Sequence, residues 1–206
     1  MFSRTTAYVD GYNLYYGLRD RGWKWAYWLD LPSLARTLLK PTQQLLHTHY
    51  FTAIVKRPDD KRRRQAIFLE ALQTKADLSI HFGHFLAETV LCRRCGHQYE
   101  THHEKMTDVN IAVQLMTDAF QDQFDTAILI SADSDLVAPI KAVRRLFSAN
   151  RVIVAFPPER ESGELKKHAN GYVYLGRDAF AKSLLLLPDP VVKPNGYLLR
   201  RPPIWR

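Results

Sequence analysis

The chain has 206 residues, of which 46% are hydrophobic and 24% are charged, and its formal net charge is +8. This length suits one globular domain, and the apolar run "LLLLP" is too short to span a bilayer, so we expect no membrane partner. The start "MFSRTT" leads into a strand rather than an apolar leader, which favours the cytoplasm, and the positive charge favours a polyanion such as RNA or DNA.

Apolar runs and helical patterns alternate along the chain. The strand candidates are residues 6–10, 45–55, 78–87, 125–131, 151–156 and 172–176. The helix candidates are residues 31–41, 59–76, 106–120, 133–147 and the segment around 162–169. This alternation predicts an α/β sandwich with a mostly parallel central sheet.

Two segments depart from the alternation. An insert at 86–104 is polar and carries both cysteines, and we expect it to form a hairpin or knuckle within a domain at 1–183. The basic, proline-rich segment at 184–206 has no helical stripe, which predicts an extended or disordered tail. In the helix at 106–120, one stripe is expected to face the core: Val109, Ala112, Val113, Met116 and Phe120.

Carboxylates gather at one edge of the predicted sheet, where ligands bind in parallel sheets. Asp10 ends the first strand, and Asp133 and Asp135 follow the run that starts at Ala127. Asp108 opens a helix that would run antiparallel to the strands, which puts it at the same edge. Four carboxylates would repel unless a hard cation such as Mg²⁺ or Mn²⁺ lay among them, and such an ion can ready a water to attack a phosphodiester.

These residues also have a simpler interpretation as helix caps. Asp is common at strand-to-helix junctions, so capping explains Asp10, Asp108 or Asp135 taken alone. Asp133 is harder to explain in this way, because nearby serines already offer hydroxyls for capping. Asn13 would orient an Asp10 oxygen, contact a phosphate, or belong to a plain turn.

Three segments of the chain resemble the signature blocks of one family. They read "YVDGYNLYYGLR", "EKMTDVNIAVQLMTDAF" and "DTAILISADSDLVAPIKAVRRLF", and they occur in the family's order. The chain thereby resembles NYN domains, a PIN-like, FLAP-nuclease-related group that includes the LabA-like proteins, over roughly residues 5–176. The resemblance implies a three-layer Rossmann-like sandwich with a metal-dependent ribonuclease site.

The resemblance also implies site residues, matched motif by motif. Asp10 and Asn13 match the family's D-x-x-N, and Asp108 matches the acidic residue that opens the central helix. The family's S-G-D-S-D appears with Ala132 in place of the glycine, which leaves both carboxylates. The expected catalytic residues and Mg²⁺ or Mn²⁺ ligands are Asp10, Asp108, Asp133 and Asp135. The residues expected to position the substrate are Asn13, Ser131 and Lys105.

The cysteine pair Cys92 and Cys95 lies in "CRRCGHQYETHH", which has the form of a zinc knuckle. The remaining ligands would be drawn from His84, His97, His102 and His103. We favour His102 or His103 with His84, because a hairpin would bring its two ends together. Bound zinc, reduced thiols and, last in a reducing compartment, a disulfide all stay open.

Cations and aromatic residues add to the case for a nucleic-acid partner. The charge run from Lys61 to Arg64, with Arg57, would ordinarily be solvated surface, but phosphate contacts from such cations would give salt-sensitive affinity for RNA. Tyr15, Tyr16 and their neighbour Tyr12 would stack on bases or belong to the core.

The favoured hypothesis is therefore a metal-dependent endoribonuclease that acts on single-stranded or structured RNA. The alternative is a catalytically weak RNA-binding or regulatory module with the same fold. A phosphatase of the haloacid dehalogenase type would need D-x-D after the first strand, where this chain reads D-G-Y-N. Self-association into a homo-oligomer is left open.

Overall fold

The computed structural model describes residues 2–91, 94–181 and 185–206, and for 84–90, 99–105 and 181 it describes the backbone alone. Within these ranges the main sheet has the strand order β4-β3-β2-β1-β5-β6-β7. Its strands are β1 (Ser3–Asp10), β2 (Gln43–Ala53), β3 (Leu78–Leu91), β4 (Gln98–Lys105), β5 (Thr126–Ile130), β6 (Arg151–Phe156) and β7 (Gly171–Tyr174). All neighbours pair in parallel except β4, which pairs antiparallel with β3 at the edge.

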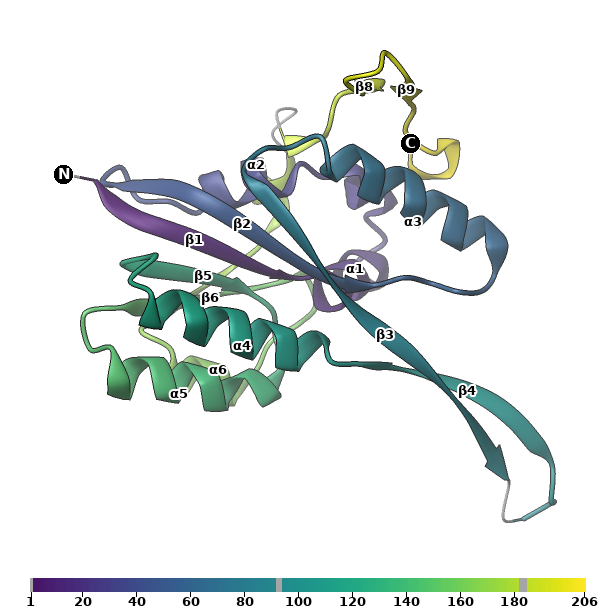
Figure 1. Ribbon diagram of the computed structural model, residues 1–206, viewed down its shortest axis with the longest axis horizontal. Coiled ribbons are helices and arrows are strands. Elements are labelled where there is room, and N and C mark those ends of the chain that lie inside the picture. Colours follow the sequence, from purple (N-terminus) through teal and green to yellow (C-terminus); the bar gives the residue numbers. More distant parts are fainter. Residues whose placement is uncertain (1, 92–93, 182–184) are drawn as a thin grey trace.

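Helices cover both faces of this sheet, which confirms the predicted α/β sandwich (Figure 1). The α-helices are α1 (Gly11–Asp20), α2 (Leu31–Thr37), α3 (Asp59–Leu72), α4 (Thr107–Phe120), α5 (Val137–Leu146), α6 (Gly163–His168) and α7 (Arg177–Ala181). Short 3-10 helices are η1 (Lys24–Trp28), η2 (Ser134–Leu136) and η4 (Pro203–Trp205). No helix in the described ranges is long and apolar enough to cross a membrane.

Two hydrophobic clusters hold the layers together, one on each face of the sheet. Residues of α1, α2 and α3 pack with Val9 and Ile130 on one face, and residues of α4, α5 and α6 pack with Tyr8 and Leu129 on the other. Every residue of β5 is buried. Successive side chains of a strand point to opposite faces, so the central strands need apolar residues at both parities. The unbroken apolar runs in the sequence have this origin.

The predicted core stripe of α4 is wrong for three of its five residues, whereas Met116 packs against the core as expected. Val109, Val113 and Phe120 are exposed, and Phe120 keeps 78% of its surface in solvent. The stripe that faces the sheet instead contains Ile111 and Leu115, both fully buried, together with Asp118 and Ala119. The helix carries apolar residues on two sides, and the buried side also carries Asp118, which accepts a hydrogen bond from Tyr8 of β1 and lies 3.3 Å from His49 of β2.

Residues 185–206 fold back onto the α1–α3 face rather than forming the extended tail that the sequence predicted. They contain a small antiparallel sheet of β8 (Val191–Val192) and β9 (Leu198–Leu199), and Trp205 is 9% exposed. The Trp205 ring lies 5.8 Å from the Tyr27 ring and 6.3 Å from both Trp28 and Phe68, measured between centroids. Burial of this aromatic surface outweighs the cost of ordering a proline-rich segment. The proposed domain boundary itself stays a prediction.

The insert forms a hairpin of β3 and β4 that projects from the body of the molecule (Figure 1). Its backbone register runs from His84 opposite Lys105 at the base to Leu91 opposite Gln98 near the tip. Arg94 and Cys95 lie in the turn that follows. The predicted hairpin is therefore present, and its long arm separates the base from the tip.

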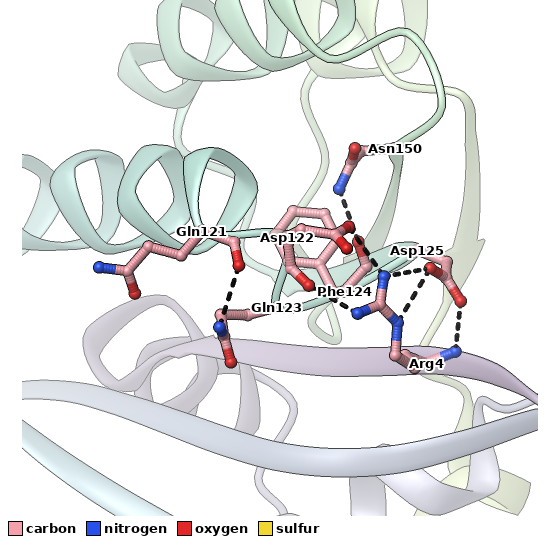
Figure 2. A network of polar contacts seen from close by, with 7 residues as sticks. All are labelled: Arg4, Gln121, Asp122, Gln123, Phe124, Asp125 and Asn150. Carbon is pink, nitrogen blue, oxygen red and sulfur yellow. Dashed lines mark hydrogen bonds and ion pairs between the residues drawn. The ribbon is translucent and has the colours of Figure 1, made fainter.

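At the edge of the sheet where the parallel strands begin, an arginine ties the start of β1 to the loop before β5 (Figure 2). The Arg4 guanidinium donates to the Asp125 carboxylate and to both the backbone oxygen and the side chain of Asp122. These hydrogen bonds, first those with Asp125, raise the pKa of Arg4. The Asn150 side chain donates to the Phe124 carbonyl nearby. This network belongs to the end of the strands away from the predicted carboxylate site.

Candidate active site

Asp10 occupies the junction of β1 and α1 and is almost fully buried, at 1% exposure. Its carboxylate caps α1 by accepting a hydrogen bond from the Asn13 backbone N–H at 3.0 Å. The Asn13 side-chain amide also donates to Asp10 Oδ2 at 2.6 Å. The capping interpretation is thus correct for Asp10, and Asn13 orients one of its oxygens. Capping alone does not explain the burial, because a Ser or Asn would cap equally well at a smaller cost of desolvation.

A serine links Asp10 to the loop that follows β5. The Ser131 hydroxyl donates to Asp10 Oδ2 at 2.8 Å and accepts from the Asp133 backbone N–H at 3.0 Å. The Ala132 N–H donates to Asn13 Oδ1 at 3.4 Å, so the β1 and β5 loops are joined at two points. One oxygen of Asp133 accepts from the Asp135 N–H at 3.0 Å and caps η2, so the expectation that nearby serines would do the capping in place of Asp133 is wrong. The structure therefore brings together four residues predicted from the sequence: Asp10, Asn13, Ser131 and Asp133.

The charge state of Asp10 reflects competing effects. Burial raises the pKa of Asp10, the hydrogen bonds from Asn13 and Ser131 oppose that rise, and the negative charge of Asp133 adds to it. The net result is a pKa above the ordinary value for aspartate. A raised pKa means that the folded protein holds this carboxylate in its charged form at a cost. A cation next to Asp10 and Asp133 would remove that cost.

The other two predicted carboxylates lie on neighbouring elements. Asp108 is in the first turn of α4, which packs against η2 and β1, and Asp135 is an exposed residue of η2 itself. Among the described residues, however, no three His, Cys, Asp or Glu side chains are arranged as a metal-binding group. The structure thus links Asp10 to Asp133 through Ser131 and sets Asp108 and Asp135 on neighbouring elements.

Several predicted residues lie outside what the structure describes. Cys92 does so entirely, and only the backbone is described for Lys105, His84, His102 and His103. The backbone register still bears on the favoured zinc ligands. His84 lies seven residues along β3 from Leu91, which is about 23 Å in a strand. A metal ion held by Cys95 at the turn is too far from the hairpin base to include His84, whereas the exposed His97 lies beside the turn.

Sequence reasoning missed Tyr50, a buried residue of β2 next to this site. A ring carbon and the hydroxyl oxygen of Tyr50 lie 2.8 Å from the position that a Cβ atom on Gly11 would take, so Tyr50 packs directly against the residue after Asp10. Burial first, and then the charge of Asp10, raise the pKa of Tyr50 to about 12. Tyr50 belongs to an ordinary strand pattern, so only the three-dimensional fold reveals its position.

A second polar group lies under the sheet on the α4 side. The Tyr8 hydroxyl donates to Asp118 at 2.6 Å, His49 Nε2 lies 3.3 Å from the same carboxylate, and His49 Nδ1 lies 2.9 Å from His81 Nε2. Burial, followed by the charge of His49, lowers the pKa of both His47 and His81. Burial alone would raise the pKa of Asp118, but hydrogen bonds from His49, Tyr8 and a glutamine lower it. This group joins the sheet to α4, and the lowered pKa values of His47 and His81 favour the uncharged forms of these two side chains.

Comparison with known proteins identifies the class to which this fold and site belong. The family model of the NYN domain matches residues 4–176, which is most of the chain, so the chain belongs to the NYN domain family. NYN domains are generally PIN-like nucleases, and the fold seen here is nuclease-like.

Two individual proteins are similar to this chain. One is 6-hydroxy-3-succinoylpyridine 3-monooxygenase HspA of Pseudomonas putida, which is 29% identical over 176 residues. That match covers 68% of this chain and 55% of the monooxygenase, so it spans about half of the relative's length. The other is the crystal structure of a protein of unknown function from Vibrio parahaemolyticus, with a TM-score of 0.55 and 18% identity, covering 86% of this chain and 95% of that one. The second similarity concerns the fold alone.

Proposed function

We propose that the chain is a metal-dependent endoribonuclease that hydrolyses RNA phosphodiester bonds beside Asp10. The observation that carries this proposal is the Asp10 carboxylate, which is buried and which three hydrogen bonds hold in one orientation. Burial raises the pKa of Asp10, and the charge of a second carboxylate, Asp133, adds a smaller rise. Fixing two like charges together is unfavourable in a protein that uses them only as helix caps. The same pair of close carboxylates is useful in a site that binds a cation and a phosphate.

The residues of this site would have separate roles in hydrolysis. Asn13 and Ser131 hold Asp10, and the half-buried Asp133 stays accessible to solvent and would accept the proton of an attacking water. The water oxygen then bonds to phosphorus, the bond from phosphorus to one ribose oxygen breaks, and that oxygen takes a proton from solvent. Lys105 would position the substrate, and Asn13 and the fully buried Ser131, both expected to do the same, would act only through the Asp10 that they hold.

The residues present fit a Mg²⁺ or Mn²⁺ ion. Mg²⁺ in proteins is commonly held by one or two carboxylates, with water and substrate phosphate completing its shell, so Asp10 and Asp133 suffice as a core. Asp108 and Asp135 would contribute from α4 and η2. When bound, the ion lowers the pKa of a water and offsets charge on the phosphate. A structural zinc is proposed separately at the hairpin tip, on Cys92 and Cys95 with His97 rather than His84.

RNA, single-stranded or structured, is the proposed partner, and cytoplasmic location and self-association stay predictions. The alternative function is a catalytically weak RNA-binding or regulatory module. A second candidate comes from the Pseudomonas putida relative, whose name gives a small aromatic acid as substrate. The observation that favours it is a cavity beside Asp10 that is lined by aromatic and cationic side chains.

One experiment separates these candidates. Purified protein is incubated with a mixed RNA pool in Mg²⁺, in Mn²⁺ and with a chelator. The nuclease proposal expects cleavage that needs the metal and stops with the chelator. Retention of RNA without cleavage would favour the binding module, and inertness toward RNA would leave the small-molecule candidate.

A further inference from the structure

A cavity of about 540 Å³ lies between α1, η1, α3 and η4. Its volume falls in the range of pockets that hold small ligands, roughly 300–1,000 Å³. It is distinct from the hydrogen-bonded group around Asp10, yet the two share a boundary, because Gly11 and Tyr12 line the cavity and directly follow Asp10 in the chain. Tyr50, whose pKa the Asp10 charge helps to raise, lines it as well.

Aromatic rings from separate parts of the chain form a continuous wall of this cavity. The Tyr15 and Tyr27 rings are 5.0 Å apart between centroids, Tyr27 and Trp205 are 5.8 Å apart, and Trp205 and Phe68 are 6.3 Å apart. Trp205 belongs to the C-terminal segment, so that segment completes the wall. Tyr15 remains 37% exposed, which leaves an aromatic face available to a ligand. Planar heterocycles stack on such faces.

The same cavity is strongly cationic. Five of its lining residues are Arg or Lys, and among the described residues that line it none is Asp or Glu. Arg19 and Arg64 form ion pairs with Asp20 and Asp60. The other three are exposed and form no ion pair within the described part of the chain: Lys24, Arg57 and Lys61. A cavity with three unpaired positive charges and an aromatic wall favours a ligand that is both planar and anionic.

We propose that this cavity binds one nucleotide, with its base against the Tyr15–Tyr27 rings and its phosphate against Lys24, Arg57 and Lys61. A nucleotide matches the cavity better than a one-ring acid does, because the volume accommodates a base together with a ribose and a phosphate. The purpose of the site rests on the proposed function: a nucleotide of an RNA chain held here lies beside Asp10, where the adjoining phosphodiester would be cut. Binding itself does not depend on cleavage and is measured without it.

The test is the binding of AMP and of UMP to the full chain in chelator, measured by calorimetry. Both should bind, because stacking is tolerant of base identity. Tyr15→Ala should weaken binding about tenfold through lost stacking. Lys61→Gln should weaken it about threefold, as expected for one exposed charge. The matched control is Arg63→Gln, an exposed cation of the same helix that does not line the cavity, and it should bind like the parent.

Several outcomes would overturn the proposal. Parental affinity in both Tyr15→Ala and Lys61→Gln would place nucleotide binding elsewhere. The lysine variant keeps this result interpretable if the tyrosine variant folds poorly, because Lys61 is exposed. Tighter binding of nicotinate, a planar aromatic acid, than of AMP would assign the cavity to small aromatic acids. Metal-dependent RNA cleavage without any mononucleotide binding would refute the cavity assignment and leave the proposed function standing.

Discussion

Gly11 follows Asp10 at the start of α1, and its replacement by alanine probes how closely this helix approaches the sheet. A Cβ atom on Gly11 would lie 2.6 Å from the Phe51 carbonyl oxygen and 2.8 Å from both a ring carbon and the hydroxyl oxygen of Tyr50. The nearest of these atoms belongs to the backbone of β2 and has little freedom to move. The first turn of α1 would therefore have to shift away from β2, and it would carry the Asp10 cap with it.

The size of this effect follows from what overpacking costs in a well-packed core, about 1–3 kcal/mol. For a chain of this length, each kcal/mol lowers the melting temperature by about 2–4 °C, so Gly11→Ala should melt roughly 2–12 °C lower than the parent. The assay is thermal unfolding followed by circular dichroism. The control is Gly163→Ala at the start of α6, where an added Cβ meets nothing within 4 Å. That variant should be neutral or more stable by up to about 1 kcal/mol.

The reasoning would be refuted by a Gly11→Ala protein that melts with or above the parent. Such a result would mean that α1 does not approach β2 as closely as the structure shows. The geometry of the Asp10 site, which depends on the same approach, would then need revision. Equal decreases of the melting temperature in the Gly11→Ala and Gly163→Ala variants would also contradict this close approach, since only Gly11 is crowded.

Three further predictions concern the C-terminal segment, the buried histidines and the hairpin. Trp205→Ala should lower the free energy of unfolding, measured with urea, by about 3–5 kcal/mol, because the Trp205 ring packs on three other rings. Arg206→Ala, at an exposed ion pair, should change this free energy little, and equal stability of the two variants would contradict the packing of Trp205. Burial lowers the pKa of His47 and His81, so their contribution to the free energy of unfolding should be fully present above pH ~6.5 and fall as the pH drops below that value. A free energy of unfolding that stays constant between pH ~7.5 and ~5.5 would contradict this prediction. If the hairpin tip holds zinc, elemental analysis should find close to one ion per chain, and Cys95→Ser should release it, whereas metal-free reduced protein would remove the proposal.

The sequence predicted the layers of the fold and the proximity of Asp10 to Asp133 because both follow from local patterns. Unbroken apolar runs such as β5 occur only where a strand is covered on both faces. Parallel strands end at one edge, so Asp10 at the end of β1 and Asp133 after β5 had to lie close together. Both inferences needed only the order of elements and the direction of each strand.

The features that the sequence did not predict depend on contacts between distant segments. α4 has two apolar sides, and the local pattern does not show that the Ile111 and Leu115 side, on which Asp118 contacts Tyr8 of β1, is the one that faces the sheet. The C-terminal segment has many prolines and little local order, yet Trp205 docks on rings from η1 and α3. The aromatic cavity escaped notice for the same reason, since its wall is assembled from four separate elements.

The central claim, that Asp10 serves chemistry as well as capping, is tested most directly by RNA cleavage in Mn²⁺ for Asp10→Asn beside Asp178→Asn. Asn caps a helix about as well as Asp but lacks the negative charge, and Asp178 is an exposed carboxylate of α7 away from the site. We expect Asp10→Asn to lose at least about 100-fold in cleavage rate while melting close to the metal-free parent, because removal of a buried charge offsets the hydrogen bond that an amide nitrogen cannot accept. Asp178→Asn should cleave like the parent. An Asp10→Asn protein that cleaves RNA as fast as the parent would contradict the account.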